Sequence, residues 1–398
     1  AVIGVSVGQW ASEFDKVLMG TPAGRSVYAS TGFACSVTCG RVSFVLGLQG
    51  PCASFDTACS ASLVGNHSSM RALQRLECES ALSAGVNMIL DASTMRGNAV
   101  AGFTSVRGRS HTFDSRADGY ARGEAISAIV CQLSEGGEQA VRLLGSAIRQ
   151  DGRSASLTAP NGQAQQRVLT AALLDARLAA EQMSALEAHG TGTALGDPIE
   201  AGAAAAVFLV ERSGVNGPLA IGSLKANAGH TEPGAGLSGA LKLMSQLQDI
   251  MLPPNAQLRV LNPHVAATLR RRVPYALPTQ VEALPVSDMG SGLIGGVSSF
   301  GYSGTIAHAV MQGASGAGGI GALGASLPPL TYRRRAFPWR DTAAGAAAGT
   351  TSMYARCWSA SALPQVDTAS PVGRVVFLTA GKRATQSLTA QGAAARRG

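Results

Sequence analysis

The sequence predicts a layered α/β fold, and three observations support this prediction. The chain has 398 residues, of which 46% are hydrophobic and 14% charged, so it can bury a large core. Short strand-like segments alternate with helical segments along the first three quarters of the chain, as in folds where helices cover sheets. The 49 glycines indicate many tight turns and close backbone approaches.

The first elements follow in order from the N-terminal end. An apolar strand is predicted at 1–7 and a helix at 41–48, and a strand-like segment at 52–58 leads directly into Cys59. Apolar residues with a helical period follow at 60–76, and strands are predicted within 77–90 and 117–133. Cys59 therefore lies at a junction between a strand and a helix.

The alternation then continues. A strand is predicted at 140–150, a strand end at 185–190, and a strand followed by a loop at 219–227. Helices are predicted at 163–180, 198–212 and 234–249, and a pair of strands around a glycine-rich turn at 291–312. From residue 313 the composition changes to Gly, Ala and Ser, with one aromatic and basic segment, "PPLTYRRRAFPWRD". Residues 313–398 are therefore predicted to be a linker and tail.

Charge and hydropathy exclude several classes of partner. The net charge of +8 is spread along the chain, and no basic stretch carries interleaved aromatic residues, so nucleic-acid binding is not expected. A moderately basic surface suits an acidic protein or an anionic cofactor arm. No apolar run is long enough to span a bilayer, and the first residues do not have the pattern of a signal peptide.

The cysteines predict a reducing environment. The chain has seven of them, an odd number without metal-ligand spacing, at positions 35, 39, 52, 59, 78, 131 and 357. Neither a metal site nor a disulfide framework is expected. Reduced thiols place the protein in a reducing compartment, either the cytoplasm or a plastid.

The stretch "FDTACSASL", residues 55–63, raises the question of whether Cys59 is reactive. At the first turn of a helix, unpaired N–H groups and the helix dipole favour a thiolate. The small neighbours Ala58, Ser60 and Ala61 leave room for an acyl group. A buried structural cysteine is the alternative, and the residues alone leave both open.

Three further stretches contain candidate site residues. His189 ends a strand and precedes a Gly-Thr-Gly-Thr turn in "EAHGTGTALGDPIEA", whose third glycine comes one position too late for a dinucleotide loop. Lys225 and His230 share a loop of small residues, "GSLKANAGHTEPGAG", where a lysine needs a partner. The turn in "SSFGYSGTIAH" has backbone amides that could face a ligand. Structural roles for each histidine, and a plain β-turn, remain alternatives.

Other polar residues carry weaker signals. Asp114–Gly119 resembles a calcium loop, but Ala125 stands at its twelfth position, where such loops have Glu. His67 is expected to be a packing or surface residue, and His111 and His264 have no supporting context.

Taken together, "DTACSASL", "EAHGTGTALGDPIEA", "SLKANAGHTEPGAG" and "GVSSFGYSGTIAH" resemble the β-ketoacyl synthases, the condensing enzymes of fatty acid and polyketide synthesis. The resemblance is strongest to ketosynthase domains of type I polyketide synthases and extends from residue 1 to about 312. It implies a thiolase-like fold of two stacked, similar α/β halves in five layers, normally dimeric. The halves are expected at 1–136 and 137–312, the first without the opening segment that the family has.

The resemblance also implies an activity and roles for individual residues. Cys59 would take an acyl chain from the phosphopantetheine arm of an acyl carrier protein, and a malonyl-type extender on a second carrier would lose carbon dioxide and attack it. His189 and His230 match the family's histidine pair, with Lys225 and Glu124 in support. The backbone N–H groups of Cys59 and Tyr302 would form an oxyanion hole, with the gate at Phe300, Gly301 and Tyr302. No bound cofactor is expected.

Two positions depart from the family's pattern, which has Phe at Tyr302 and Asn at Ile306. A backbone donor tolerates the first change, whereas the second removes a polar side chain near the site. A catalytically silent scaffold that docks carrier proteins is therefore an alternative function. A thiolase is a weaker one, because the region where thiolases use a second cysteine as base has His308 and no cysteine, and the loop with Lys225 and His230 better fits a decarboxylating site.

Overall fold

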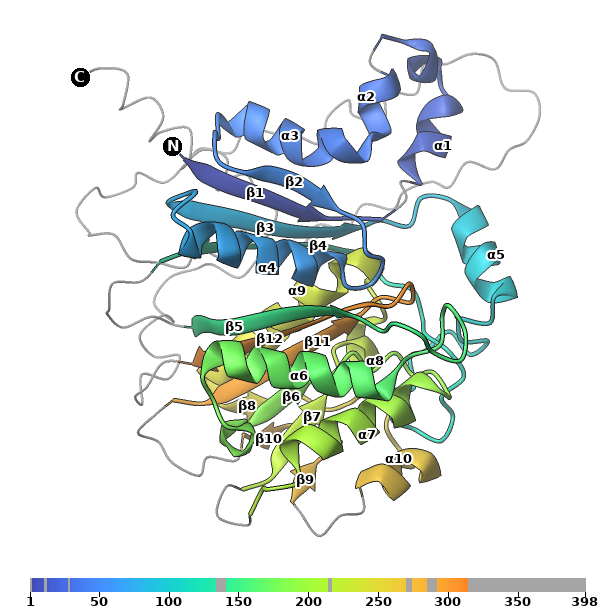
Figure 1. The fold of residues 1–398 in the computed structure, drawn as a ribbon. Coiled ribbons are helices and arrows are strands. Elements are labelled where there is room, and N and C mark those ends of the chain that lie inside the picture. Colours follow the sequence, from blue (N-terminus) through green and yellow to red (C-terminus); the bar gives the residue numbers. More distant parts are fainter. Residues whose placement is uncertain are drawn as a thin grey trace. The chain divides into compact units, whose positions relative to one another are not determined.

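The computed structural model describes residues 2–10, 13–27, 29–133, 141–213, 217–269, 274–284 and 292–313 (Figure 1). The predicted linker and tail lie outside them from residue 314 onward. None of the helices in these ranges is long and apolar enough to cross a membrane.

The first sheet has four strands in the order β2-β1-β3-β4. Three of these strands run parallel, and β4 pairs antiparallel with β3. Their bounds are Ile3–Gly8 for β1, Cys52–Phe55 for β2, Ser80–Asn87 for β3 and Ala125–Gln132 for β4. All four strands lie where the sequence predicts them. β2 forms one edge of this sheet.

The second sheet has six strands in the order β5-β12-β11-β6-β7-β9. β5, β12 and β11 pair antiparallel, whereas β11, β6, β7 and β9 run parallel. Their bounds are Val141–Gln150, Thr305–Gly313, Ile294–Phe300, Ala185–Glu187, Leu219–Gly222 and Tyr275–Ala276, in that spatial order. β11 is buried along its whole length, because helices cover both faces of the sheet there.

Helices form three layers around the two sheets (Figure 1). α3, Cys35–Leu46, packs on β1 and β2 at the outer face of the first sheet, and it begins six residues before the predicted segment at 41–48. α4, Ala61–Gln74, and α9, Ala235–Asp249, lie between the sheets and contact both. α6, Gly162–Ala176, packs on β5 and β12, and α7, Gly196–Phe208, packs on α6. The result is the predicted five-layer order.

Local sequence explains where the long helices begin and end. The Asn161 side chain caps α6 by accepting the N–H groups of Gln163 and Ala164. Arg177 and Ile250 end α6 and α9 in the left-handed conformation that closes many helices. α9 buries residues around most of its circumference, because it lies between two sheets.

The sequence pattern does not predict the short elements. They are α1 at Phe14–Met19, η1 at Pro22–Arg25, α2 at Ala29–Phe33, α5 at Ala92–Val100, η2 at Ala180–Gln182, α8 at Lys225–Ala228, η4 at Glu232–Gly234, α10 at Pro263–Leu269, β8 at Met251–Leu252 and β10 at Glu282–Ala283. Most are too short to produce a hydrophobic period, and α1 and α2 bury no residue.

A pair of leucine substitutions tests the central layer. Leu237 on α9 is fully buried, whereas Leu174 on α6 is 72% exposed. Leu237→Ala is expected to lower the free energy of unfolding by about 2–5 kcal/mol, because it opens a cavity in the core. Leu174→Ala should change it by less than about 0.5 kcal/mol. Urea unfolding followed by circular dichroism measures both, and equal losses would contradict the assigned layer.

Candidate active site

A sharp turn presents Cys59 between β2 and α4. Ala58 has φ of 53°, a left-handed conformation that costs energy for a residue with a side chain, and α4 begins two residues after Cys59. The Ser299 hydroxyl donates to the Cys59 carbonyl at 2.7 Å and fixes the turn against β11. Cys59 is only 5% exposed. The predicted position at a strand-to-helix junction is therefore confirmed.

His230 lies directly against Cys59, although 171 residues separate them in the chain. Its Nε2 is 3.0 Å from Cys59 Sγ, and its Nδ1 accepts the backbone N–H of Glu232 at 3.1 Å. A neutral ring that accepts at Nδ1 carries its proton on Nε2, so Nε2–H is a donor toward the thiol. Burial holds the pKa of His230 well below its usual value, and the nearby charges of Lys225 and Arg122 lower it further.

His189 stands beside His230 with the same arrangement of hydrogen bonds. The ring centroids are 5.6 Å apart and the rings are nearly perpendicular. His189 Nδ1 accepts the backbone N–H of Phe300 at 3.3 Å, which again leaves the proton on Nε2. Burial also lowers its pKa strongly, with added effects of Lys225 and His230. The site therefore holds two neutral imidazoles that each have one N–H to donate.

Two carboxylates to which the sequence pattern assigns no role hold the His189 loop. Glu200 accepts the N–H groups of His189 at 2.6 Å and Gly190 at 2.7 Å, and Asp197 accepts that of Gly192 at 3.0 Å. Burial raises the pKa of Glu200 to about 7 and that of Asp197 to about 6. Both residues lie in "GDPIEA" at the start of α7 and are three residues apart, so they share one helix face. This spacing is the signal in the sequence that could have identified them.

Lys225 is buried beside the two histidines, as expected of a lysine with partners. Burial lowers its pKa, while the charges of Glu187 and Glu200 oppose that shift. Glu187 also accepts the N–H of Leu224 at 2.6 Å and pairs with Lys242 at 2.6 Å. These contacts fix the backbone that leads into Lys225.

The resting state of Cys59 differs from the expected thiolate. Burial raises the pKa of Cys59 to about 12, and the Glu232 charge adds to that effect. Lys225 and the backbone N–H groups of Tyr302 and Cys59 act in the opposite direction without overcoming burial. The junction does direct N–H groups at sulfur, but desolvation outweighs them, so the free thiol is protonated at neutral pH.

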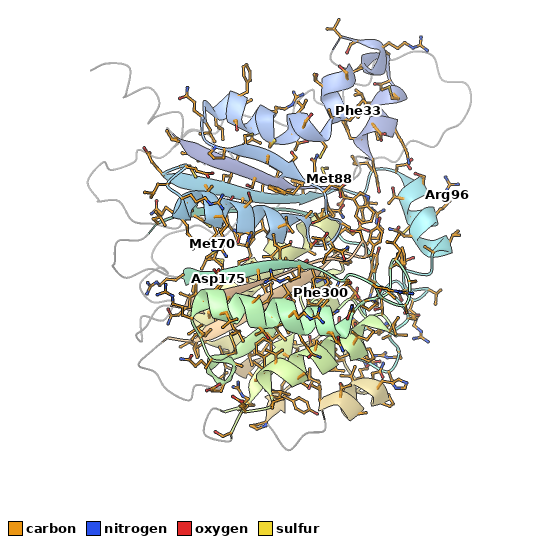
Figure 2. The ribbon with its side chains drawn as sticks, in the orientation of Figure 1. Phe33, Met70, Met88, Arg96, Asp175 and Phe300 are labelled. Carbon is orange, nitrogen blue, oxygen red and sulfur yellow. The ribbon has the colours of Figure 1, made fainter. Side chains whose placement is uncertain are left out.

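The turn after β11 closes over Cys59. A Cβ on Gly301 would lie 2.4 Å from the Thr57 carbonyl oxygen, so only glycine fits there. Phe300, labelled in Figure 2, ends β11 with its ring centroid 5.5 Å from that of His189. The Tyr302 ring is 43% exposed and lies 5.8 Å from each of Trp10 and Phe103. Of the residues predicted for the oxyanion hole and gate, Cys59 and Tyr302 thus direct backbone N–H groups at the sulfur, whereas Phe300 lies beside His189.

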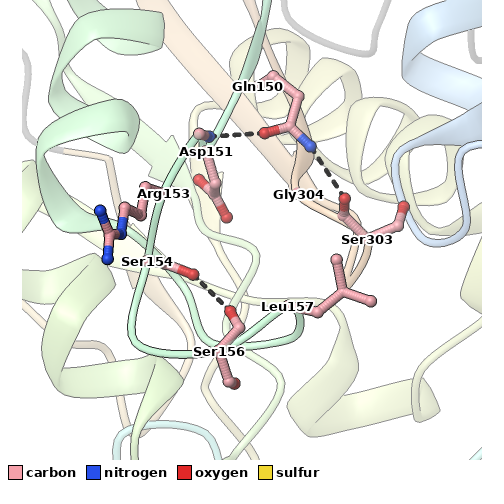
Figure 3. A pocket seen from close by; sticks show the side chains of 9 residues that line it. Gln150, Asp151, Arg153, Ser154, Ser156, Leu157, Ser303 and Gly304 are labelled. Atoms are coloured by element: carbon pink, nitrogen blue, oxygen red, sulfur yellow. Dashed lines mark hydrogen bonds between the residues drawn. The ribbon is translucent and has the colours of Figure 1, made fainter.

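A cavity of about 320 Å³ borders this turn (Figure 3). Gly304 and Ser303 form one wall, and the rest is formed by Gln150 at the end of β5 and the segment that follows it as far as Leu157. Asp151 is a wall residue, and burial raises its pKa to about 6. The cavity borders the turn but does not include Cys59 or either site histidine.

The position of Glu124 differs from the prediction that it supports the site. Its side chain is exposed, and its carboxylate accepts the N–H of Ile89 at 2.8 Å. The acidic groups whose charges act on Lys225 are Glu187 and Glu200 instead. Glu124 directly precedes β4, at a position where its side chain is exposed at the surface of the molecule.

The weaker candidates have structural environments. His67 Nδ1 contacts the Ser146 hydroxyl at 3.1 Å. Asp114 binds the Arg116 guanidinium and three backbone N–H groups instead of forming an open loop. Ile306 is fully buried in the apolar cluster that contains Phe300. His308 contacts the Ser298 hydroxyl and lies near Phe208 on α7.

Comparison with known proteins gives the family. The family model "Beta-ketoacyl synthase, N-terminal domain" matches residues 1–135, and "Beta-ketoacyl synthase, C-terminal domain" matches residues 140–259. The chain belongs to the β-ketoacyl synthase family. It is 40% identical over 315 residues to a phenolphthiocerol/phthiocerol polyketide synthase polypeptide of Mycobacterium tuberculosis, with 78% of this chain and 16% of that protein covered.

Other β-ketoacyl synthases agree. The chain is 39% identical over 322 residues to the pikromycin polyketide synthase component PikAII of Streptomyces venezuelae, with 79% of this chain and 8% of that protein covered. It superposes on the ketosynthase from module 6 of the bacillaene synthase of Bacillus subtilis 168 with a TM-score of 0.70 and 31% identity, covering 78% of this chain and 54% of that one. The predicted thiolase-like fold and the resemblance to type I polyketide synthases are thus confirmed. The chain spans a small part of the synthases and about half of the ketosynthase structure.

Gly301 provides a test of the turn over Cys59. Gly301→Ala places a methyl group against the Thr57 carbonyl and should shift the Tyr302 N–H away from the thiol. Because misplacement by about 1 Å can cost about 100-fold in rate, acylation of Cys59 by acyl thioesters should fall by about that factor. Intact-mass spectrometry measures the rate. Gly97→Ala on α5, where nothing lies within 4 Å of the added Cβ, is the control. Equal rates in the two variants would contradict the assigned contact.

Proposed function

We propose that the chain catalyses the decarboxylative Claisen condensation of a Cys59-bound acyl chain with a malonyl-type extender in polyketide or fatty acid synthesis. The observation that carries this proposal is the pair of neutral histidines beside one buried thiol. Two N–H donors converging near a nucleophile suit a reaction that forms an acyl-enzyme and then an enolate. Both substrates are thioesters on the phosphopantetheine arm of an acyl carrier protein.

In the first step the Cys59 sulfur attacks the acyl thioester. The bond from the acyl carbon to Cys59 forms, the bond to the carrier sulfur breaks, and the Cys59 thiol proton passes to the departing carrier sulfur, which leaves as a thiol. Such an exchange of thioesters is nearly balanced in energy, and the attacking species is the thiolate that forms as the proton leaves the Cys59 sulfur for the leaving group. The N–H groups of Cys59 and Tyr302, directed at the sulfur, would hold the carbonyl oxygen.

In the second step a malonyl-type thioester loses carbon dioxide. The electron pair of the broken C–C bond forms an enolate, whose oxygen accepts hydrogen bonds from His189 Nε2–H and His230 Nε2–H. The enolate carbon attacks the acyl carbonyl, the bond to Cys59 breaks, and the released thiolate takes up a proton from water. The positive charge of Lys225 lowers the energy of the anionic species. No step needs a cofactor.

The partners follow from the same chemistry. Carrier proteins that deliver a phosphopantetheine thioester are the expected partners, and the net charge of +8 favours acidic ones. We place the enzyme in a reducing compartment, cytoplasm or plastid, because the six described cysteines are free.

A second copy of the chain is the further partner. β2 is an edge strand with exposed Cys52 and Ala53, and α3 beside it exposes Phe44 and Val45. An uncovered edge next to apolar side chains is a surface that proteins normally cover. We therefore place a homodimer contact at β2 and α3.

The alternative functions receive less support. A silent scaffold was suggested by Ile306, but that side chain is packed in the core, and Cys59, His189 and His230 still converge. A thiolase needs a second thiol as base, and His308 in that region contacts Ser298 instead of Cys59.

Incubation with acyl- and malonyl-carrier protein tests the condensation. The wild-type chain should add one acyl mass at Cys59 and then release carbon dioxide and a β-ketoacyl carrier. Cys59→Ala should abolish acylation, because the nucleophile is gone, and should retain some decarboxylation through the histidines. Cys78→Ala, which removes another buried thiol, is the matched control. Acylation that survives Cys59→Ala would contradict the assigned nucleophile, and a wild-type chain without condensation would refute the function.

Sedimentation analysis tests the dimer contact. Phe44 on α3 is 87% exposed and Val100 on α5 is 91% exposed, so a glutamate can replace either residue at a similarly exposed position. Phe44→Glu should shift the mass toward the monomer, because the partner would have to bury a carboxylate. Val100→Glu should leave the mass unchanged. A dimer unaffected by Phe44→Glu would place the contact elsewhere.

A further inference from the structure

A buried ion triad lies behind His230 on the side away from Cys59. Arg122 Nη2 is 2.8 Å from Glu13 Oε1 and 2.9 Å from Glu232 Oε2, and Arg122 Nε contacts both oxygens of Glu232. The side chains of Arg122, Glu13 and Glu232 are 2%, 5% and 1% exposed. Burying three charges is costly unless hydrogen bonds satisfy them, so this triad requires a physical explanation.

The triad is connected to His230 through the backbone on both sides. The N–H of His230 donates to the Ala121 carbonyl at 2.7 Å, and the N–H of Gly123 donates to the His230 carbonyl at 2.8 Å. Arg122 thus lies between Ala121 and Gly123, whose backbone groups bond to His230. On the other side, the N–H of Glu232 occupies His230 Nδ1.

Glu232 adopts a strained conformation to make that contact. Its φ is 47°, in the left-handed region that residues other than glycine rarely occupy. Such strain persists only where surrounding contacts fix the residue. Arg122 makes three contacts to the carboxylate, and Asn87 and Asn98 each add one. The side chain of Glu232 therefore keeps its own backbone N–H aimed at His230.

Glu13 extends the connection to the segment before α5. Its carboxylate accepts the N–H groups of Leu90 and Asp91, both at 2.7 Å, as well as binding Arg122. Glu13 thereby fixes the Arg122 guanidinium from the side opposite Glu232. The two carboxylates share one guanidinium, so the triad carries one net negative charge, and the charge on Glu232 also raises the pKa of Cys59.

We propose that Arg122, held by Glu13, is a positioning residue that keeps the Glu232 N–H on His230 Nδ1 and so maintains His230 as an Nε2–H donor toward Cys59 and the extender. Without this contact the neutral ring can place its proton on either nitrogen. The Nδ1–H form presents a lone pair, not a donor, to the developing enolate. The effect of the His230 Nε2–H donor on turnover rests on the proposed function, whereas the tautomer of the His230 ring does not.

Histidine NMR on the chain without substrates tests the proposal. With ¹⁵N-labelled histidine and His230→Asn to assign the signal, wild-type His230 should show one tautomer, with Nδ1 unprotonated. Arg122→Gln should shift the His230 signals toward a mixture of tautomers. Arg122→Lys keeps the positive charge but lacks the planar guanidinium with its paired N–H donors, so it should give an intermediate shift. If Arg122→Gln does not fold, Arg122→Lys provides the test. Arg71→Gln, which breaks the Arg71–Asp175 pair away from His230, should leave the signals unchanged.

Kinetics provide a second readout. In Arg122→Gln the condensation kcat should fall about ten-fold or more, with the KM for the extender carrier changed less than about two-fold, because a donor to the enolate is misplaced. Wild-type His230 signals in a folded Arg122→Gln or Arg122→Lys would overturn the proposal, as would an equal loss of kcat in Arg71→Gln. A wild-type chain that does not condense would refute the proposed function and leave the NMR result valid.

Discussion

The site depends on the close packing of α4 against α9 between the two sheets. A Cβ on Gly236 of α9 would lie 2.7 Å from the Cβ of Leu63 on α4, and one on Gly85 of β3 would lie 2.7 Å from that of Ser62. Glycine at these positions lets the helices and the first sheet approach closely. Because Cys59 lies two residues before the start of α4 and His230 lies shortly before α9, this approach places the thiol 3.0 Å from the imidazole.

Desolvation controls the chemistry of this buried site. It raises the pKa of the Cys59 thiol and lowers the pKa values of both site histidines, so the reacting groups are neutral at rest. A neutral thiol and neutral N–H donors need no counter-ions before substrate enters. Charge then develops only during reaction, where preorganised donors and Lys225 lower its energy most effectively.

Buried acidic side chains surround the site and hold the backbone of its loops. Glu200 fixes the backbone of His189, Glu187 fixes the segment before Lys225, and Glu232 fixes His230. Each acidic side chain accepts or directs a backbone N–H, so its role is to orient a loop. The loops themselves are rich in glycine, so without these contacts they would have many accessible conformations.

The sequence by itself determined the α/β alternation, the position of Cys59 at a strand-to-helix junction and, through its motifs, the family and the residues that meet at the site. Those features are local, because periodicity and short motifs lie within a few residues of each other. Only the tertiary structure decided the protonation state of Cys59, the exposed place of Glu124 and the triad around Arg122. Each of these depends on burial or on contacts between residues far apart in the chain, which no local pattern encodes.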